Sequence, residues 1–482
     1  MSSETNLTQG TRRRFLGTMT ALTAASYSRV IGANNRVGLG VIGFGLISKT
    51  HIQGYRTYKD VDIRGLCDVY KPRVEAGRAY TQNPDCKGYS DFRKMFEDKE
   101  IDGVFVGTPD HWHTMLTVMA CAAGKDVYVE KPLTVYVDEG KYMLQARDKY
   151  KRVVVVGNQR NQNPAHLVAQ KIVKSGVLGK IHMVKLGGSV RNIYPGFGKT
   201  PVENPPADLD YDMWLGPAPK KPYQNHRALY HFRWFWDYSG GQLTNLGAHS
   251  ISAFLLTMGV KGPNKIVSFG GRELLEDDGE TPDTQEVIYE FPEGFRMMTG
   301  VREANAFRDG NVSVVMGTKG NLLLGSNTIV SELRGNPFNS VPRGGDGHPI
   351  GGVVYDDTKP VPWIEGLPAA APAPAARRAR GEARPPSTLA PADFPGEDML
   401  YLNQRQFVEC IRTRGKPLCD LETGHRTAIM CNLGNMSLRL GGRTIRWDPD
   451  KEVVIGDKEA AAMCTPHYRA PWDGILRSLV KV

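Results

Sequence analysis

The 482-residue chain is poor in cysteine, in long apolar runs and in segments of one charge sign. Its 7 cysteines are an odd number, and no two of them are spaced CxxC, which excludes a disulfide scaffold and a zinc site of the usual spacing. Several of them lie in apolar runs, so we expect buried free thiols and a protein that folds in a reducing compartment. The weakly apolar stretch near the start is shorter than the roughly 20 residues that a membrane-spanning helix needs.

Charge is spread along the chain, although 61 Lys and Arg outnumber 51 Asp and Glu. The basic clumps, residues 12–14 and the run ARRARGEAR at 376–384, have no interleaved aromatic residues, so we expect no nucleic-acid partner. A composition of 40% hydrophobic and 23% charged residues excludes wholesale disorder, a coiled coil and a collagen-like fibre. The length predicts two or three globular domains.

The first residues carry paired arginines followed by a modest apolar stretch. Residues 11–17 read TRRRFLG, and an Ala- and Thr-rich segment follows. This resembles a twin-arginine export signal, which predicts a signal peptide at residues 1–33 and a mature protein in the periplasm or otherwise outside the cytoplasm. The twin-arginine route carries folded proteins, so it is compatible with reduced thiols. A basic, disordered N-terminus is the alternative.

A glycine-rich turn follows the first apolar strand. Residues 37–42, VGLGVI, lead directly into GFGLIS at 43–48 and a helical stretch. This is the strand–turn–helix context in which a G-x-G-x-x-G fingerprint binds a dinucleotide. Gly43 permits the tight turn, and Gly45 lets the backbone approach a pyrophosphate at the helix N-terminus. Ser48 stands where the third glycine is expected.

An acidic residue ends the second predicted strand, at residues 63–69. Asp68 can accept both ribose hydroxyls of NAD and repel a 2′-phosphate, although a turn aspartate would also explain it. Lys71 and Arg73 nearby leave NADP open. Helices and strands then alternate as far as residue 129, which predicts a parallel sheet with crossover connections.

Polar residues occupy two loops at the carboxyl ends of these strands, where open α/β sheets bind their ligands. The loops are GTPDHWH at 107–113 and VEKPL at 129–133. Asp110 and His113 would also serve as a turn residue and a helix cap. Glu130 and Lys131 form an adjacent acid and base that leave a buried strand, and Pro132 fixes the backbone after them.

The segments GFGLISKTH, CDVY, TPDHWH and EKP, in this order, resemble the Gfo/Idh/MocA family of NAD(P)-dependent oxidoreductases. The resemblance implies an α/β protein with a Rossmann doubly wound parallel sheet at 36–157. It implies a C-terminal α/β domain at 158–482 with a large, mostly antiparallel sheet, through which the chain would form a homo-oligomer. The implied cofactor is NAD, with NADP left open, and its implied binding residues are Gly43, Phe44, Gly45, Leu46, Ile47, Asp68, Thr108, Pro109, His113, Glu130, Lys131 and Gln159.

A second family segment lies at residues 240–252, where GGQLTNLGAHSIS matches the family pattern GGxxxDxGxH. A helix that begins near Leu243 would place Asn245 and His249 on one face, pointing into one cleft. His249 alone would suggest an ordinary core histidine. Many family members have Asp where this chain has Asn245, and an amide cannot act as a base, so an Asp–His relay is in doubt here.

Aromatic residues crowd the segment FRWFWDYSG at 232–240. Aromatic faces with polar neighbours hold sugar rings, which makes Trp236 and Asp237 candidate substrate residues beside Arg160, Asn245 and His249, although such residues are also ordinary core. Residues 367–395 are rich in Ala, Pro and Arg without apolar periodicity, and we interpret them as a mobile loop or linker.

The resemblance assigns proton transfer to Lys131, with His249 in support and Glu130 positioning either Lys131 or the nicotinamide ribose. A buried lysine beside a positive nicotinamide ring should have a lowered pKa and act near neutral pH. The reaction needs no metal, and no cluster of metal ligands is visible.

Three functions remain open. The first is NAD(P)-dependent oxidation of a sugar, polyol or sugar derivative, the second an NAD-dependent glycosidase that works by oxidation and elimination, and the third non-catalytic nucleotide binding. An intact Lys131 argues against the third.

Overall fold

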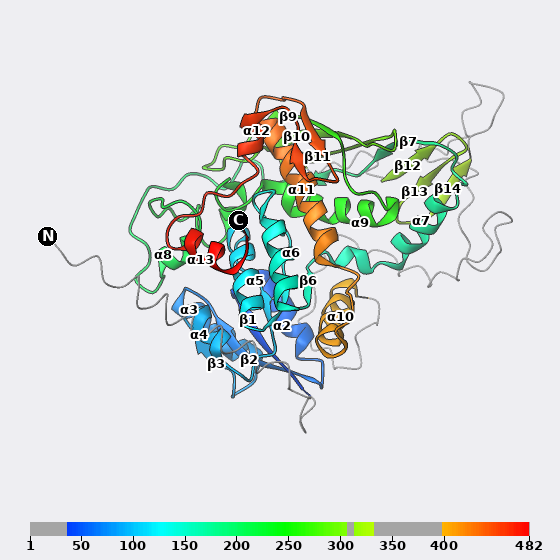
Figure 1. The fold of residues 1–482 in the computed structure, drawn as a ribbon. Helices are drawn as coiled ribbons and strands as arrows, with labels where there is room; N and C mark the ends of the chain where they lie inside the picture. The colour runs from blue at the N-terminus through cyan, green and yellow to red at the C-terminus, as the bar shows by residue number, and fades with distance from the viewer. Residues whose placement is uncertain (1–35, 306–312, 332–397, 482) are drawn as a thin grey trace.

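The computed structural model describes residues 36–305, 313–331 and 398–481 (Figure 1). The predicted signal peptide at 1–33 and the predicted linker at 367–395 lie outside these residues. Within them, no helix has both the length and the apolar character needed to cross a membrane.

Six short strands from the first part of the chain form one sheet. They are β1 (Val37–Ile42), β2 (Val61–Cys67), β3 (Lys87–Tyr89), β4 (Gly103–Val106), β5 (Asp126–Val129) and β6 (Val154–Val156). All neighbouring pairs are parallel, in the order β3-β2-β1-β4-β5-β6. The predicted parallel sheet is confirmed, and its order is that of the Rossmann fold.

Helices connect these strands and cover both faces of the sheet. They are α2 (Leu46–Tyr55), α3 (Lys71–Thr81), α4 (Phe92–Glu97), α5 (His113–Ala122) and α6 (Glu139–Tyr150). Every residue of β1 is buried, as expected for a strand with helices on both sides. The sequence indicated all of these helices except α6. That helix is mostly polar, so its sequence shows no clear apolar face, although part of it is buried.

A larger sheet forms the second layer of the molecule (Figure 1). Its strands are β7 (Ile181–Lys185), β8 (Ser189–Val190), β9 (Lys265–Gly271), β10 (Thr284–Glu290), β11 (Arg296–Arg302), β12 (Val314–Gly317), β13 (Gly320–Leu323), β14 (Thr328–Ser331), β15 (Ile445–Asp448) and β16 (Val453–Val454). The pairs are antiparallel except those of β11 with β7 and β8. The predicted fold class, a C-terminal α/β domain with a large, mostly antiparallel sheet, is confirmed.

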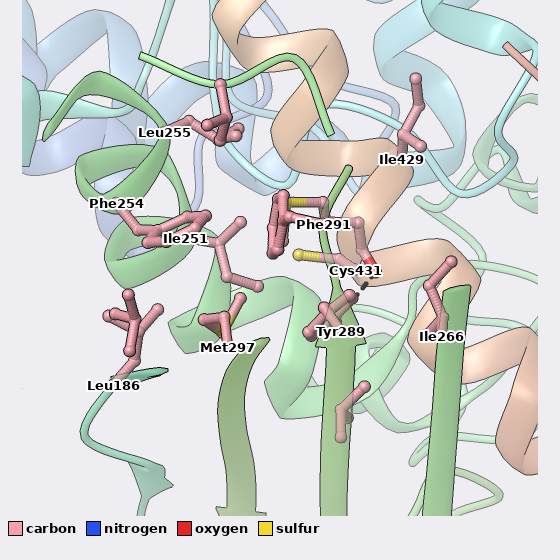
Figure 2. Close-up of a cluster of buried hydrophobic side chains, with 14 of the residues drawn as sticks. Leu186, Ile251, Phe254, Leu255, Ile266, Tyr289, Phe291, Met297, Ile429 and Cys431 are labelled. Carbon is pink, nitrogen blue, oxygen red and sulfur yellow. Dashed lines mark hydrogen bonds between the residues drawn. The ribbon is translucent and has the colours of Figure 1, made fainter. Parts of the chain in front are cut away.

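Helices α7 (Pro164–Lys174), α9 (Ala248–Met258) and α11 (Leu421–Arg439) cover one face of this sheet. Figure 2 shows the core between them, where Ile251 and Phe254 of α9 lie above Met297 of β11. The hydroxyl of Tyr289 on β10 donates to the carbonyl of Met430 on α11 at 3.0 Å. This core fixes α9, the helix that begins at the predicted site.

The opposite face of the sheet exposes apolar side chains. Phe269 of β9 is 62% exposed and Ile288 of β10 is 41% exposed. Assembly of a homo-oligomer through this sheet stays a prediction.

The last part of the chain returns to the first sheet. Helix α10 (Met399–Thr413) packs beside α2, and its Phe407 is fully buried against Tyr128 of β5. Helix α13 (Trp472–Leu479) packs on α5, and its Trp472 contacts Trp112, the residue before α5, with ring centroids 4.8 Å apart. The core of the first domain therefore includes side chains from the end of the described chain.

Two short helices, α8 (Tyr211–Leu215) and α12 (Lys458–Ala462), complete the described structure. All 7 cysteines are buried and free, as predicted. Burial raises the pKa of each of these thiols.

Candidate active site

A cavity of about 630 Å³ opens at the carboxyl ends of the parallel strands. This is within the roughly 300–1,000 Å³ usual for small-molecule sites. The cavity runs from the glycine-rich turn after β1 to the first turn of α9. The predicted site residues that line it are Gly43, Phe44, Gly45, Leu46, Ile47, Asp68, Thr108, Pro109, Glu130, Lys131, Gln159 and His249.

The glycine-rich turn depends on Gly43. Its φ is +86°, and a Cβ there would lie 2.9 Å from the carbonyl oxygen of Gly107, so only glycine suits both the conformation and the close approach of β4. Ser48, at the third position of the fingerprint, is fully buried and donates its hydroxyl to the Gly43 carbonyl at 2.5 Å. Ser48 thus stands in place of the third glycine and stabilises the turn through this hydrogen bond.

Gly45 stands at the N-cap of α2 and faces open space. A Cβ on Gly45 would meet no protein atom within 4 Å, and no side chain caps the helix. The N-terminus of α2 therefore offers its backbone N–H groups to the cavity, an arrangement that suits a phosphate. These residues fit the predicted pyrophosphate of a dinucleotide.

Asp68 follows β2 and is 7% exposed. Its two carboxylate oxygens accept the backbone N–H groups of Phe44 at 2.8 Å and of Tyr70 at 2.9 Å. Burial raises the pKa of the Asp68 carboxyl, while these backbone donors and the nearby Arg73 lower it. The carboxylate thus ties the glycine-rich turn to the next strand and still reaches the cavity, which Arg73 and Lys49 also line.

Lys131 is anchored by Asn245. The Lys131 Nζ donates to the backbone oxygen and to the side-chain Oδ1 of Asn245, both at 2.9 Å. Asn245 lies in a π-helical turn, Leu243–Gly247, that precedes α9. The predicted helix opening near Leu243 is therefore present, and its wide first turn brings Asn245 to the lysine.

A buried polar chain orients the Asn245 amide. Its Nδ2 donates to Gln242 Oε1 at 3.0 Å, and the side chain of Gln242 faces Glu303, which also accepts the Trp234 indole N–H at 2.8 Å. Burial raises the pKa of Glu303 to about 7, while the hydrogen bond from Trp234 and the nearby amide of Gln242 lower it. The amide nitrogen has its own acceptor, so Oδ1 is the atom that faces Lys131.

The surroundings of Lys131 favour its neutral form. Removal of the ammonium group from water lowers the pKa of Lys131, and the positive charges of Arg233 and Arg160 lower it further, whereas Glu130 and Asp110 raise it. A neutral amine has two N–H groups and one lone pair. In the neutral form both N–H groups can donate to Asn245, which leaves the lone pair for the cavity.

Glu130 is held by a buried network from two distant elements. Its Oε1 lies 2.9 Å from His51 Nε2 on α2, and its Oε2 accepts the backbone N–H of Lys131 at 3.1 Å. Gln404 on α10 contacts His51 Nδ1 at 2.8 Å through its amide nitrogen. Because that nitrogen donates, the His51 proton is on Nε2 and points at Glu130. Glu130 thus positions the backbone of Lys131.

His249, the second residue of α9, lies on the cavity wall and is 8% exposed. Burial lowers the pKa of His249 far below its ordinary value, and the charges of Lys131 and Arg160 lower it further, so the ring is neutral. The ring lies at the cavity wall, and its buried Nδ1 carries no hydrogen bond from the described residues.

The structure places four predicted site residues elsewhere. His113 is buried beneath the loops, with its ring nitrogens 2.7 Å from the Pro132 carbonyl and 3.0 Å from the Thr108 carbonyl, and it does not line the cavity. Arg160 is exposed, and its Nη1 is 3.4 Å from Ser250 Oγ outside the cavity lining. His113 joins the two loops and does not face the cofactor site.

Trp236 and Asp237 also lie outside the cavity lining. The Trp236 ring packs under the guanidinium of Arg439 at 5.0 Å, and Asp237 pairs with Lys221 at 2.6 Å. The chain makes a short 3-10 turn just before them, which directs their side chains away from the cavity. The same turn directs Phe232 and Arg233 into it.

Several functional residues escaped the sequence analysis. His51 belongs to the buried face of α2, shared with Ser48, Ile52 and Tyr55, and a histidine in that apolar spacing was a usable signal. Glu303 and Gln404 gave no signal, because each is distant in sequence from the residue that it contacts. Gln242 lies only three residues before Asn245 and was overlooked. No cluster of side chains that could hold a metal ion occurs in the described ranges.

Known proteins resemble both parts of the chain. A family model described as an oxidoreductase family with an NAD-binding Rossmann fold matches residues 37–158. The model of that family's C-terminal alpha/beta domain matches residues 163–342 and 392–474, more than half of the chain. The predicted Rossmann domain and its NAD cofactor agree with the first model.

Two curated relatives match about a third of the chain. An inositol 2-dehydrogenase of Salmonella typhimurium is 28% identical over 147 residues, which are 30% of this chain and 44% of the relative. A levoglucosan dehydrogenase of Pseudarthrobacter phenanthrenivorans is 28% identical over 152 residues, 30% of this chain and 39% of the relative. The chain thus spans less than half the length of these relatives.

A solved structure extends the likeness to both domains. The WlbA dehydrogenase of Bordetella pertussis, in complex with NADH and UDP-GlcNAcA, has a TM-score of 0.58 at 17% identity and covers 86% of this chain and 99% of its own. At that identity the likeness concerns the fold alone. Because the two family models together cover both domains, the chain belongs to the Gfo/Idh/MocA oxidoreductase family.

Proposed function

We propose that the protein is an NAD-dependent oxidoreductase that oxidises a secondary alcohol of a carbohydrate, with Lys131 as the proton acceptor. The observation that carries the proposal is the anchoring of Lys131 Nζ by two oxygens of Asn245, both at 2.9 Å. The lysine lines the same cavity as the glycine-rich turn. One continuous space therefore holds a dinucleotide site and a base.

The names of the relatives support this substrate class. Inositol is a cyclic polyol and levoglucosan an anhydrosugar, and each relative is named as a dehydrogenase of its compound. Both carry secondary alcohols of the kind that the cavity would hold beside Lys131.

Oxidation of a secondary alcohol to a ketone removes one proton from the hydroxyl oxygen and one hydride from the carbon. Bound NAD supplies the hydride acceptor. Lys131 Nζ receives the hydroxyl proton through its lone pair, while Asn245 keeps the amine in position. His249 donates or accepts a hydrogen bond to a substrate hydroxyl through its neutral ring.

The test is direct. The purified protein is analysed for co-purified nucleotide and then screened with NAD against sugars, polyols and aryl glycosides, with NADH formation measured by absorbance. Reduction of NAD by at least one sugar or polyol is the expected result. If no member of the panel reduces NAD or is cleaved, although NAD binds, the proposed activity is wrong.

The glycosidase alternative is supported by one feature of the site. Elimination of an aglycone after oxidation needs a second base for a carbon-bound proton, and the buried, neutral His249 has an unpartnered ring nitrogen beside Lys131 among the described residues. Cleavage of an aryl glycoside without net NADH formation would favour this function over simple oxidation.

We expect the protein to prefer NAD to NADP and the preference to narrow in Asp68→Ala. The carboxylate reaches the cavity and repels a 2′-phosphate, while Arg73 and Lys49 in the same lining would attract one. The ratio of the two dissociation constants, measured by calorimetry, should fall by about tenfold or more. Asp68→Asn keeps the side-chain shape without the charge and should also narrow the preference for NAD over NADP. If the unaltered protein binds NADP as tightly as NAD or more tightly, Asp68 does not select NAD.

We expect Asn245→Asp to shift the pH dependence of kcat/KM, so that the rise in kcat/KM on its acidic side occurs at higher pH. A carboxylate 2.9 Å from Nζ favours the ammonium form, so the pKa of Lys131 rises and more alkaline solution is needed to generate the neutral base. The expected shift is about one to three pH units. In the control Asn245→Ala, which adds no charge, this rise should not move to higher pH. An unshifted rise in Asn245→Asp would show that Lys131 is not the titrating base.

We propose that the mature protein is exported through the twin-arginine signal predicted at residues 1–33. Replacing Arg12 and Arg13 by Lys should retain full-length protein in the cytoplasm, as measured by cell fractionation and N-terminal sequencing. An unchanged distribution, with an N-terminus still near Met1, contradicts the signal.

A further inference from the structure

Arg233 is a cation on the cavity wall that the proposed proton transfer does not use. It lies in the 3-10 turn His231–Trp234, and it lines the cavity together with Lys131 and His249. Its positive charge is close enough to act on Lys131. Arg233 therefore faces the place where a substrate must lie if Lys131 takes its proton.

The guanidinium of Arg233 has few protein partners. Its Nη1 donates to the Tyr230 carbonyl at 3.1 Å, and its Cζ lies 4.5 Å from the Phe232 ring centroid and 5.6 Å from that of Tyr230. No carboxylate of the described residues lies within the 4.0 Å of an ion pair. Most of its five N–H donors are therefore uncommitted. The charges of Asp110 and Glu130 act on Arg233 without touching it. A partly buried cation with no carboxylate in direct contact is costly, and an anion bound to it would relieve that cost.

The carboxylates nearest to this part of the cavity are engaged with other groups. Asp110 accepts the Ser239 hydroxyl at 2.5 Å, and Glu130 accepts from His51 and from the Lys131 backbone. A further cation, Arg191, lies behind the aromatic residues, with its Cζ 5.7 Å from the Trp234 ring centroid. The local arrangement thus favours a negative group on the ligand.

We propose that Arg233 binds a carboxylate of the substrate, so that the preferred substrates are acidic sugars such as uronic acids. The proposal rests on the proposed function, because it concerns the same cavity and the same alcohol oxidation. A guanidinium presents two parallel N–H groups that match the two oxygens of a carboxylate. A neutral sugar offers hydroxyls to the same donors but leaves the charge uncompensated.

The experiment compares sugars that differ only at C6. kcat/KM is measured with NAD for D-glucuronate against D-glucose and for D-galacturonate against D-galactose, with D-glucose 6-phosphate as a further anion. The acid of at least one pair should be preferred about 10- to 100-fold, the range expected for hydrogen bonds to a charged group. Arg233→Gln should abolish the preference, and Arg233→Lys should keep part of it.

Arg227→Gln is the matched control. Arg227 is a cation of the same segment, stacked on Phe235 at 4.8 Å and 3.7 Å from Glu280, and it does not line the cavity. Its loss should leave the ratio of acid to neutral sugar unchanged. Binding of D-glucuronate and D-glucose to the NADH complex, measured by calorimetry, provides a readout that does not depend on turnover.

The outcomes separate the two proposals. Oxidation of neutral sugars at least as well as of acids, or a preference that survives Arg233→Gln, overturns the carboxylate site while the oxidoreductase stands. Glucuronate binding that Arg233→Gln abolishes, without turnover of any sugar, supports the site and overturns the proposed activity. A preference for the phosphate over both acids, or neither turnover nor glucuronate binding, overturns the carboxylate site.

Discussion

In Lys131→Ala, turnover falls at least about a hundredfold while NAD still binds, because a positioned acid–base group contributes about 10²- to 10⁴-fold. The alanine removes the amine of the cavity lining whose charge acts on His249. It leaves the glycine-rich turn and Asp68 unchanged. The measurement is single-turnover reduction of bound NAD on a substrate found in the screen, with binding followed separately by nicotinamide fluorescence.

Two comparisons make this result specific. His249→Ala should cost less than Lys131→Ala, since the neutral imidazole supports a hydroxyl and no carboxylate completes a relay at Asn245. Small primary amines added to Lys131→Ala should restore part of the rate if the lost group is a proton acceptor. Near-normal turnover in Lys131→Ala would exclude the mechanism, whichever sugar is the substrate.

In Gly45→Val, the affinity for NAD falls by at least about a hundredfold while the thermal stability stays close to that of the unaltered protein. A Cβ at Gly45 meets no protein atom within 4 Å, and the backbone there is extended, so valine is compatible with the fold. The added methyl groups occupy the space over the N-terminus of α2, where the pyrophosphate would approach. Calorimetry gives the affinity and a melting curve gives the stability.

Gly43→Ala is the contrasting variant. At φ +86° and 2.9 Å from the Gly107 oxygen, its new Cβ strains the turn itself, so the melting temperature should fall. NAD binding by Gly45→Val at the affinity of the unaltered protein would mean that the cofactor does not approach this turn.

The sequence was sufficient for the first sheet and for the residues that adjoin its motifs. The alternation of helices and strands predicted the parallel sheet. The polar loop that follows the short apolar run of β5 indicated the place of Lys131 at the carboxyl edge. The contact between Lys131 and the segment at 245 was predictable only through the family resemblance, because 114 residues separate the two partners.

The second tier of the site could not be predicted. Gln404 contacts His51 from 353 residues away, and Glu303 lies beside Gln242, which precedes it by many residues. Local sequence patterns cannot predict contacts between residues so far apart. In the aromatic segment at 232–240, composition pointed to Trp236 and Asp237, which lie outside the cavity lining, whereas Phe232 and Arg233 of the same segment line it. The 3-10 turn then decided which side chains face the cavity, and it selected Arg233 over Trp236.

The return of α10 and α13 to the first sheet has a consequence for synthesis on the ribosome. A chain that grows from its amino end completes β1–β6 long before Phe407 and Trp472 are made. The nucleotide-binding half must wait with open apolar surface until those late helices pack on it, so its final folding follows translation. Such a chain gains its cofactor-binding shape only after α10 and α13 have been made.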